Sequence, residues 1–76
     1  MARQLNPAAL REIRELAGIS QPELARRAGI EQGSLSNIEH GKRGASPALL
    51  RRLAEGLKCS VDAISHHVPE PEPAVS

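Results

Sequence analysis

Helix start and stop signals divide this sequence into short segments, and they constrain its fold more than any other feature. A polar residue precedes proline at Asn6-Pro7 and Ser46-Pro47, and Ser20-Gln21-Pro22-Glu23 has the pattern of a capping box. Such pairs are typical of helix starts. The polar side chain can cap the first turn, and proline fits the first helical position because the N–H that it lacks would have no acceptor there. Single glycines at positions 18, 29 and 41 are expected to end three of the segments.

Apolar residues recur within the segments at three- and four-residue spacing, which is typical of the buried face of a helix. They predict helices that begin at Pro7, Gln21, near Gln32, at Pro47 and after Ser60. Five short helices joined by turns indicate a compact all-α domain without a sheet. The apolar positions are Leu10, Ile13, Ala17, Leu24, Ala25, Ala28, Leu35, Ile38, Leu50, Leu53, Ala54, Leu57, Val61 and Ile64.

Composition limits the protein to one small domain. The 76 residues include no Phe, Trp or Tyr, and the single cysteine, Cys59, has no partner for an internal disulfide. There is no apolar run of membrane-spanning length and no N-terminal signal region, so a cytoplasmic location is expected. Three alternate prolines predict a disordered Pro/Glu tail over residues 66–76, and residues 1–6 form an N-terminal arm to the domain of residues 7–65.

Charge is unevenly distributed along the chain. All ten Lys and Arg residues lie within residues 1–58 together with six Glu, which gives this segment a charge of +4. Residues 59–76 carry Asp62, Glu70 and Glu72 without Lys or Arg, which gives −3. A modestly basic body is compatible with binding of a polyanion.

The short connection Gly29-Ile30-Glu31 is expected to set two helices roughly at right angles, with Ala25 at the crossing. The run QPELARRAGIEQGSLSNIEHGK, from Gln21 to Lys42, resembles the helix-turn-helix of the Cro and phage-repressor (XRE-type) DNA-binding family. LREIRELAGISQ, from Leu10, and LAEGLKCSVDAI, from Leu53, extend the resemblance over residues 7–65. It implies a lambda-repressor-like five-helix fold and a small repressor that binds specific double-stranded DNA sequences.

The outward face of the third helix is the expected base-reading surface. At 100° per residue, Gly33, Ser36 and Asn37 lie opposite the apolar Leu35 and Ile38. With Gln32 at its edge, this uncharged polar face suits hydrogen bonding in a major groove, and amides can contact adenine at two atoms. The alternative is ordinary solvated surface. The family more often has a side chain at the position of Gly33, and a Ser or Thr cap at the position of Glu31.

The resemblance also implies phosphate contacts and one structural ion pair. Lys42 and Arg43 in the Gly41–Gly44 loop, Gln21 at the start of the second helix, and Ser34 are expected to contact phosphates. Arg14 and Glu39 lie at the borders of their apolar faces, and the family pairs these positions. A pair of solvated charges is the alternative.

No catalytic arrangement is evident, so no enzyme, metal or cofactor is expected. His66 and His67 lack further ligands at metal spacing, and His40 has no partners arranged as a triad. Because one recognition helix reads only about four or five base pairs, we expect a weak homodimer completed on a palindromic operator. An antitoxin that binds DNA and a protein partner through residues 66–76, and a protein-interaction module on the same fold, remain as alternatives.

Overall fold

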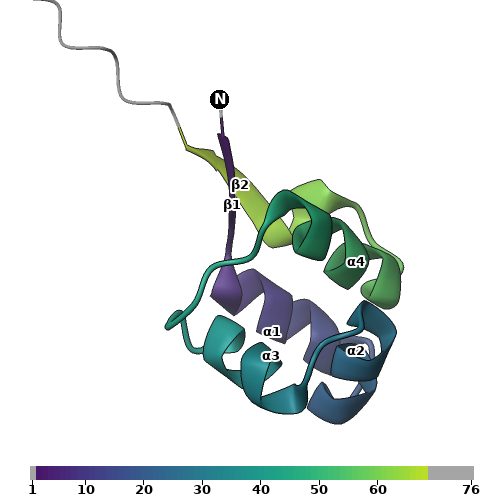
Figure 1. Ribbon diagram of the computed structural model, residues 1–76. Helices are drawn as coiled ribbons and strands as arrows, with labels where there is room; N and C mark the ends of the chain where they lie inside the picture. The colour runs from purple at the N-terminus through teal and green to yellow at the C-terminus, as the bar shows by residue number, and fades with distance from the viewer. Residues whose placement is uncertain (1, 69–76) are drawn as a thin grey trace, which may run out of the picture.

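The computed structural model describes residues 2–68, which form four α-helices, one short 3-10 helix and a two-stranded sheet (Figure 1). The first half of this part of the chain contains β1 (Ala2–Leu5), α1 (Pro7–Leu16), α2 (Gln21–Ala28) and α3 (Gln32–Glu39). The second half contains α4 (Pro47–Leu57), the 3-10 helix η1 (Val61–Ile64) and β2 (Ser65–Val68).

Side-chain caps define the starts of three helices. The Asn6 side chain accepts a hydrogen bond from the Ala9 N–H at 3.2 Å and begins α1. Ser20 and Ser46 cap α2 and α4 in the same way, each with its hydroxyl 3.2 Å from a backbone nitrogen. Glu31 precedes α3 without a side-chain capping bond. Four of the five predicted helices are therefore confirmed as α-helices, and α3 begins without the side-chain cap of the other three.

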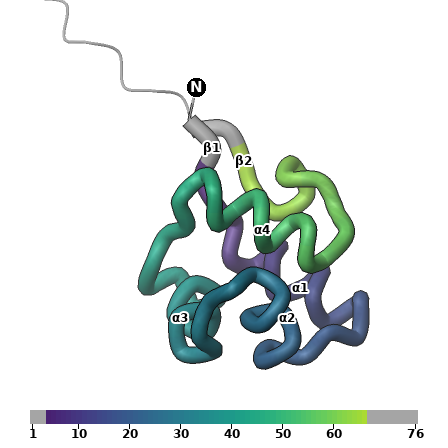
Figure 2. Tube along the Cα trace, turned by 45° about the vertical axis from the view of Figure 1, so that its right-hand side comes forward, coloured from purple at the N-terminus to yellow at the C-terminus, as the bar shows by residue number. Residues whose placement is uncertain are grey.

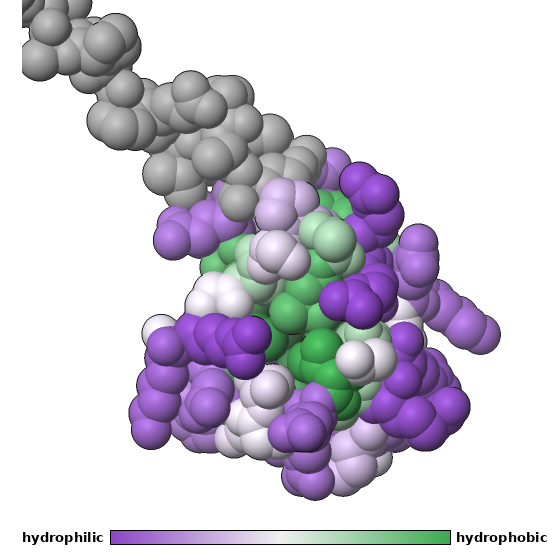
Figure 3. Space-filling view, viewed as in Figure 1, coloured by the Kyte–Doolittle hydropathy of each residue, from purple (hydrophilic) through white to green (hydrophobic). Residues whose placement is uncertain are grey.

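The core is built from leucine, isoleucine and alanine side chains contributed by all four α-helices, β1 and η1. Leu10, Leu24, Leu35, Ile38, Leu53 and Ile64 are fully buried. Ala17, expected in the core, is exposed at the end of α1. On the face seen in Figure 3, hydrophobic side chains are visible at the centre and hydrophilic ones surround them.

Helices α2 and α4 approach each other closely at Gly56. A Cβ atom at this position would lie 3.0 Å from Leu24 Cδ1 and 3.2 Å from Arg27 Cβ. Arg27 Nη1 also donates to the Gly56 carbonyl oxygen at 2.9 Å. Because Gly56 has no side chain, α4 packs closely against α2, the first helix of the helix-turn-helix.

The expectation of a domain without a sheet is wrong. β1 pairs with β2 in antiparallel register, with Ala2 opposite Val68 and Leu5 opposite Ser65. Leu5 is buried in the core, and the Asn6 N–H donates to the Ile64 carbonyl oxygen at 2.8 Å. The sheet extends from the helices at the end opposite α2 and α3 (Figures 1 and 2). Backbone pairing of segments some 60 residues apart leaves no signal in either short segment.

The expected fifth helix and the tail also need correction. Val61–Ile64 forms a single 3-10 turn rather than an α-helix, because β2 follows it at once. Residues 66–68, assigned to the disordered tail, belong to β2. Residues 69–76 of the expected tail lie outside the described residues. Within residues 2–68, no helix has the length and apolar character needed to cross a membrane.

Candidate nucleic-acid interface

A tight turn orients α3 relative to α2. Gly29 ends α2 with φ 71°, a left-handed conformation that glycine adopts without steric cost. The Ile30 N–H donates back to the Ala25 carbonyl oxygen at 3.0 Å, which closes the helix end. Ala25 is only 2% exposed, so a larger side chain at this position would displace its neighbours. The three-residue connection and the small Ala25 side chain hold the two helices as one unit.

Helix α3 has one buried face and one exposed polar face. Leu35 and Ile38 are fully buried against the core. Gln32, Gly33 and Asn37 are exposed, while Ser34 and Ser36 are half-buried. The outward side of α3 therefore presents amide and hydroxyl groups and open backbone, without a charged side chain among them.

Basic side chains follow α3 directly. The loop from Gly41 to Ala45 exposes Lys42 and Arg43, and Arg43 Nη1 donates to the Ser34 hydroxyl at 3.4 Å. The Lys42 N–H donates to the Asn37 carbonyl oxygen at 2.9 Å, so the loop begins at a fixed position on the helix end. Two positive charges therefore lie beside the uncharged polar face of α3.

An ion pair joins α1 to the end of α3. Arg14 Nε lies 2.8 Å from Glu39 Oε2, and Arg14 Nη2 lies 3.0 Å from Glu39 Oε1. The third nitrogen, Nη1, donates to the Ile19 carbonyl oxygen in the connection between α1 and α2. The Glu39 side chain is 1% exposed, and its hydrogen bond raises the pKa of the Arg14 guanidinium above the usual value. Arg14 thus ties together α1, the α1–α2 connection and α3.

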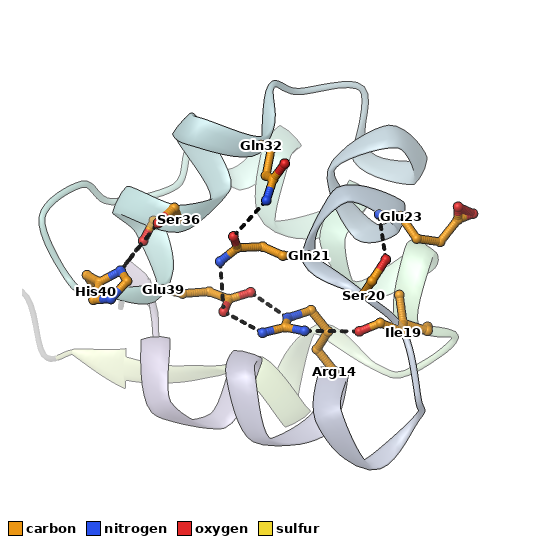
Figure 4. A network of polar contacts seen from close by, with 9 residues as sticks. All are labelled: Arg14, Ile19, Ser20, Gln21, Glu23, Gln32, Ser36, Glu39 and His40. Atoms are coloured by element: carbon orange, nitrogen blue, oxygen red, sulfur yellow. Dashed lines mark hydrogen bonds and ion pairs between the residues drawn. The ribbon is translucent and has the colours of Figure 1, made fainter.

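A chain of two amides continues from this ion pair to the start of α3 (Figure 4). Gln21 Nε2 lies 3.4 Å from Glu39 Oε1, and Gln32 Nε2 lies 3.4 Å from Gln21 Oε1. Gln21, predicted as a phosphate contact, and Gln32, predicted as a base contact, are therefore directly linked. This link was not predicted from the sequence, since 11 positions separate the two glutamines.

His40 is a further polar side chain of this surface that the sequence analysis did not assign to DNA. Its Nδ1 lies 2.7 Å from the Ser36 carbonyl oxygen, which can only accept, so Nδ1 carries the hydrogen. Its exposed ring follows Ser36 by one helical turn, and this i to i+4 spacing was the signal available in the sequence.

Other candidate chemistry gives no site in the described residues. No three His, Cys, Asp or Glu side chains between residues 2 and 68 gather as metal ligands. Cys59 is half-buried, and this burial raises the pKa of its thiol. A groove of about 480 Å³ lies between the β1–α1 junction and the Gly41–Ala45 loop, with Arg43 in its lining.

Comparison with known proteins identifies relatives of this chain. The helix-turn-helix family model HTH_3 matches residues 10–64. The competence pilus inhibition repressor of Acinetobacter baylyi is 39% identical over 56 residues, which are 74% of this chain and 51% of the relative. The transcriptional repressor RghR of Bacillus subtilis is 36% identical over 58 residues, 75% of this chain and 43% of RghR. The chain thus spans about half the length of these two relatives.

Two solved structures illustrate the similarity of the fold. The restriction-modification controller protein C.AhdI of Aeromonas hydrophila superposes with a TM-score of 0.73 at 30% identity, covering 75% of this chain and 86% of C.AhdI. The DNA-binding domain of the P22 C2 repressor gives a TM-score of 0.73 at 27% identity and 82% coverage of both chains. With a family match over most of its length, this chain belongs to the XRE-type helix-turn-helix family HTH_3.

Proposed function

We propose that this protein is a transcriptional repressor that binds specific sequences of double-stranded DNA in the cytoplasm. The observation that carries the proposal is the outward face of α3, where uncharged amides and hydroxyls lie beside the basic loop of Lys42 and Arg43. The names of the two sequence relatives, both repressors, support the same function. The role is one of binding rather than catalysis.

Base reading is assigned to α3. Gln32, Ser36 and Asn37 supply hydrogen-bonding groups for base edges in the major groove, and Gly33 lets the backbone approach the DNA closely. The exposure of Gln32, Gly33 and Asn37 on one side of α3 supports this assignment.

Phosphate binding is assigned to the groups at the margins of α3. Lys42 and Arg43 supply positive charge, while Gln21 and Ser34 supply hydrogen bonds. The contact between Arg43 and Ser34 supports a shared role for these two residues. Glu39 is buried and its charge is neutralised by Arg14, so it does not oppose the approach of a phosphate.

The DNA-bound form is proposed to be a homodimer. The exposed face of one eight-residue α3 reads too few base pairs to select a single genomic site. Two copies on a palindrome, with half-site centres about 10 base pairs apart, would double the sequence that is read.

Selection from random duplex DNA tests the function. Wild-type protein should enrich a palindromic sequence, and its affinity should fall steeply with salt. If two subunits neutralise ~4–6 phosphates, the slope of log K against log salt is about −4 to −5. No enriched sequence, or an affinity independent of salt, would overturn the proposed function.

A further inference from the structure

We propose that His40 binds a DNA phosphate in its protonated form, so that each subunit takes up one proton when it binds DNA. This inference rests on the proposed function and adds a phosphate contact and a pH dependence to it. It starts from the hydrogen bond that holds the His40 ring at the end of α3.

The His40 ring is held through one of its two nitrogens. Nδ1 lies 2.7 Å from the Ser36 carbonyl oxygen, which also accepts the backbone N–H of His40 at 3.0 Å. A carbonyl oxygen only accepts, so Nδ1 carries a hydrogen in both the neutral and the protonated ring. The ring is thereby fixed on α3, at the end of the helix away from Gln32, and Nε2 is its remaining polar atom (Figure 4).

The state of Nε2 determines what His40 can bind. In the neutral ring with its hydrogen on Nδ1, Nε2 has a lone pair and no hydrogen. A phosphate oxygen is an acceptor as well, so the neutral ring cannot form a hydrogen bond with it. A hydrogen on Nε2 instead of Nδ1 would leave two acceptor atoms facing each other at 2.7 Å. Only the protonated ring can keep its bond to Ser36 and donate to a phosphate at the same time.

His40 lies where α3 would approach the phosphates of the DNA. It follows Ser36 by four positions, so it continues the outward face of α3 by one turn. When the first turn of a recognition helix contacts base edges, its far end lies toward the wall of the major groove. His40 is eight positions after Gln32, about 12 Å along the helix axis, and it is exposed directly before the basic loop of Lys42 and Arg43.

The charges around this end of α3 couple the proton to the phosphate. The charged side chains on the neighbouring segments are Lys42 and Arg43 of the loop, Glu39 of α3 with its partner Arg14 of α1, and exposed Arg11, one turn before Arg14. Gln21 of α2 is uncharged, as are Gln4, Leu5 and Pro7 at the β1–α1 junction beside the loop. The unpaired positive charges oppose a further one on the imidazole, and a phosphate bound among them offsets this repulsion. DNA therefore favours the protonated ring more than the free protein does.

Affinity for the selected palindrome at two pH values tests the proposal. Since binding takes up protons, affinity should rise as the pH falls, and wild type should bind ~10-fold more tightly at pH 6 than at pH 8. His40→Gln cannot take up the proton, so its affinity should change by less than about threefold over this range. His40→Arg is charged at both pH values and should bind at pH 8 about as tightly as wild type does at pH 6.

Two variants and the salt dependence make the result specific. His66→Gln removes an exposed histidine of β2, at the end of the molecule opposite α3, and should keep the wild-type pH dependence. Asn37→Ala removes no charge and should weaken binding at both pH values by the same factor. For wild type, the slope of log K against log salt should be steeper at pH 6 than at pH 8 by up to about 2, and for His40→Gln the two slopes should be equal.

The outcomes separate this inference from the proposed function. Wild type that selects no DNA at either pH contradicts the function. Wild type that binds its selected DNA equally at both pH values, or a His40→Gln variant that keeps the pH dependence, contradicts the role of His40. In the DNA-free protein at pH 8, nitrogen-15 NMR should show the His40 ring with its hydrogen on Nδ1. A hydrogen on Nε2 instead would also overturn the inference.

Discussion

Arg14 of α1 and Glu39 of α3 form a two-point ion pair in which the Glu39 side chain is 1% exposed and the Arg14 side chain 13% exposed. Each of the two donor–acceptor distances is 3.0 Å or less. A charge this deeply buried is stable only while its partner is present. The pair therefore determines how firmly α3 is held against α1.

Replacing Arg14 by alanine should destabilise the fold. It leaves the Glu39 carboxylate unpaired in the core and the Ile19 carbonyl oxygen without its donor. The expected cost is ~3–5 kcal/mol, and at several degrees per kcal/mol the Tm should fall by ~10 °C or more.

Two variants control for this result. Arg11→Ala, at an exposed position of α1, should melt close to wild type. Joint replacement of Arg14 and Glu39 by leucine should recover much of the loss, since no buried charge remains. An unchanged Tm for Arg14→Ala would refute the structural role of the pair.

Leu5 should contribute far more to the free energy of unfolding than its place in a terminal strand suggests. It is 5% exposed and packs into the core, whereas Leu16 at the end of α1 is 81% exposed. Leu5→Ala should cost ~2–5 kcal/mol of unfolding free energy, and Leu16→Ala ~0.5 kcal/mol or less. Urea denaturation of both variants measures the difference, and equal losses would show that β1 does not contribute to the core.

Two helical glycines should respond oppositely to alanine. At Gly33 a new Cβ meets no atom within 4 Å, so Gly33→Ala should stabilise the protein by ~1 kcal/mol through helix propensity. At Gly56 the new Cβ meets Leu24 and Arg27 at 3.0 and 3.2 Å. Crowding that costs ~1–3 kcal/mol should outweigh the same propensity gain. Differential scanning calorimetry should give a higher Tm for Gly33→Ala and a lower one for Gly56→Ala; equal shifts would contradict the close α2–α4 contact.

Subunit stoichiometry on DNA tests the proposed dimer. A selected palindrome should bind two protomers, and its isolated half-site should bind one with much lower affinity. Titration with measurement of the mass of the complex distinguishes these states. One protomer on the full palindrome, with equal affinity for the half-site, would reject the dimer.

Local signals predicted the helical part of the fold well. Polar caps before proline and a glycine after Ala28 act within a few residues, so the helix boundaries at Pro7, Gln21 and Pro47 follow directly from the sequence. The period of apolar residues likewise identified the buried face of α3, since Leu35 and Ile38, three positions apart, are both fully buried.

These local signals could not predict interactions between residues that lie far apart in the sequence. The β1–β2 pairing depends on backbone groups of residues 2–5 meeting those of residues 65–68. The contact between Gln21 and Glu39 depends on how three helices pack, which no local pattern reports. Resemblance to a family pointed to the pairing of Arg14 with Glu39. The contacts of Gln21 with Glu39 and with Gln32 were not predicted.

The central claim is that α3 supplies sequence specificity while the following loop supplies general affinity for DNA. The most direct test measures Kd for wild type, Asn37→Ala and Lys42→Ala on the selected site and on random duplex at one salt concentration. Asn37→Ala should lose ~1–3 kcal/mol on the selected site and little on random DNA. Lys42→Ala should lose about the same on both DNAs. Equal losses on selected and random DNA for both variants would contradict the account.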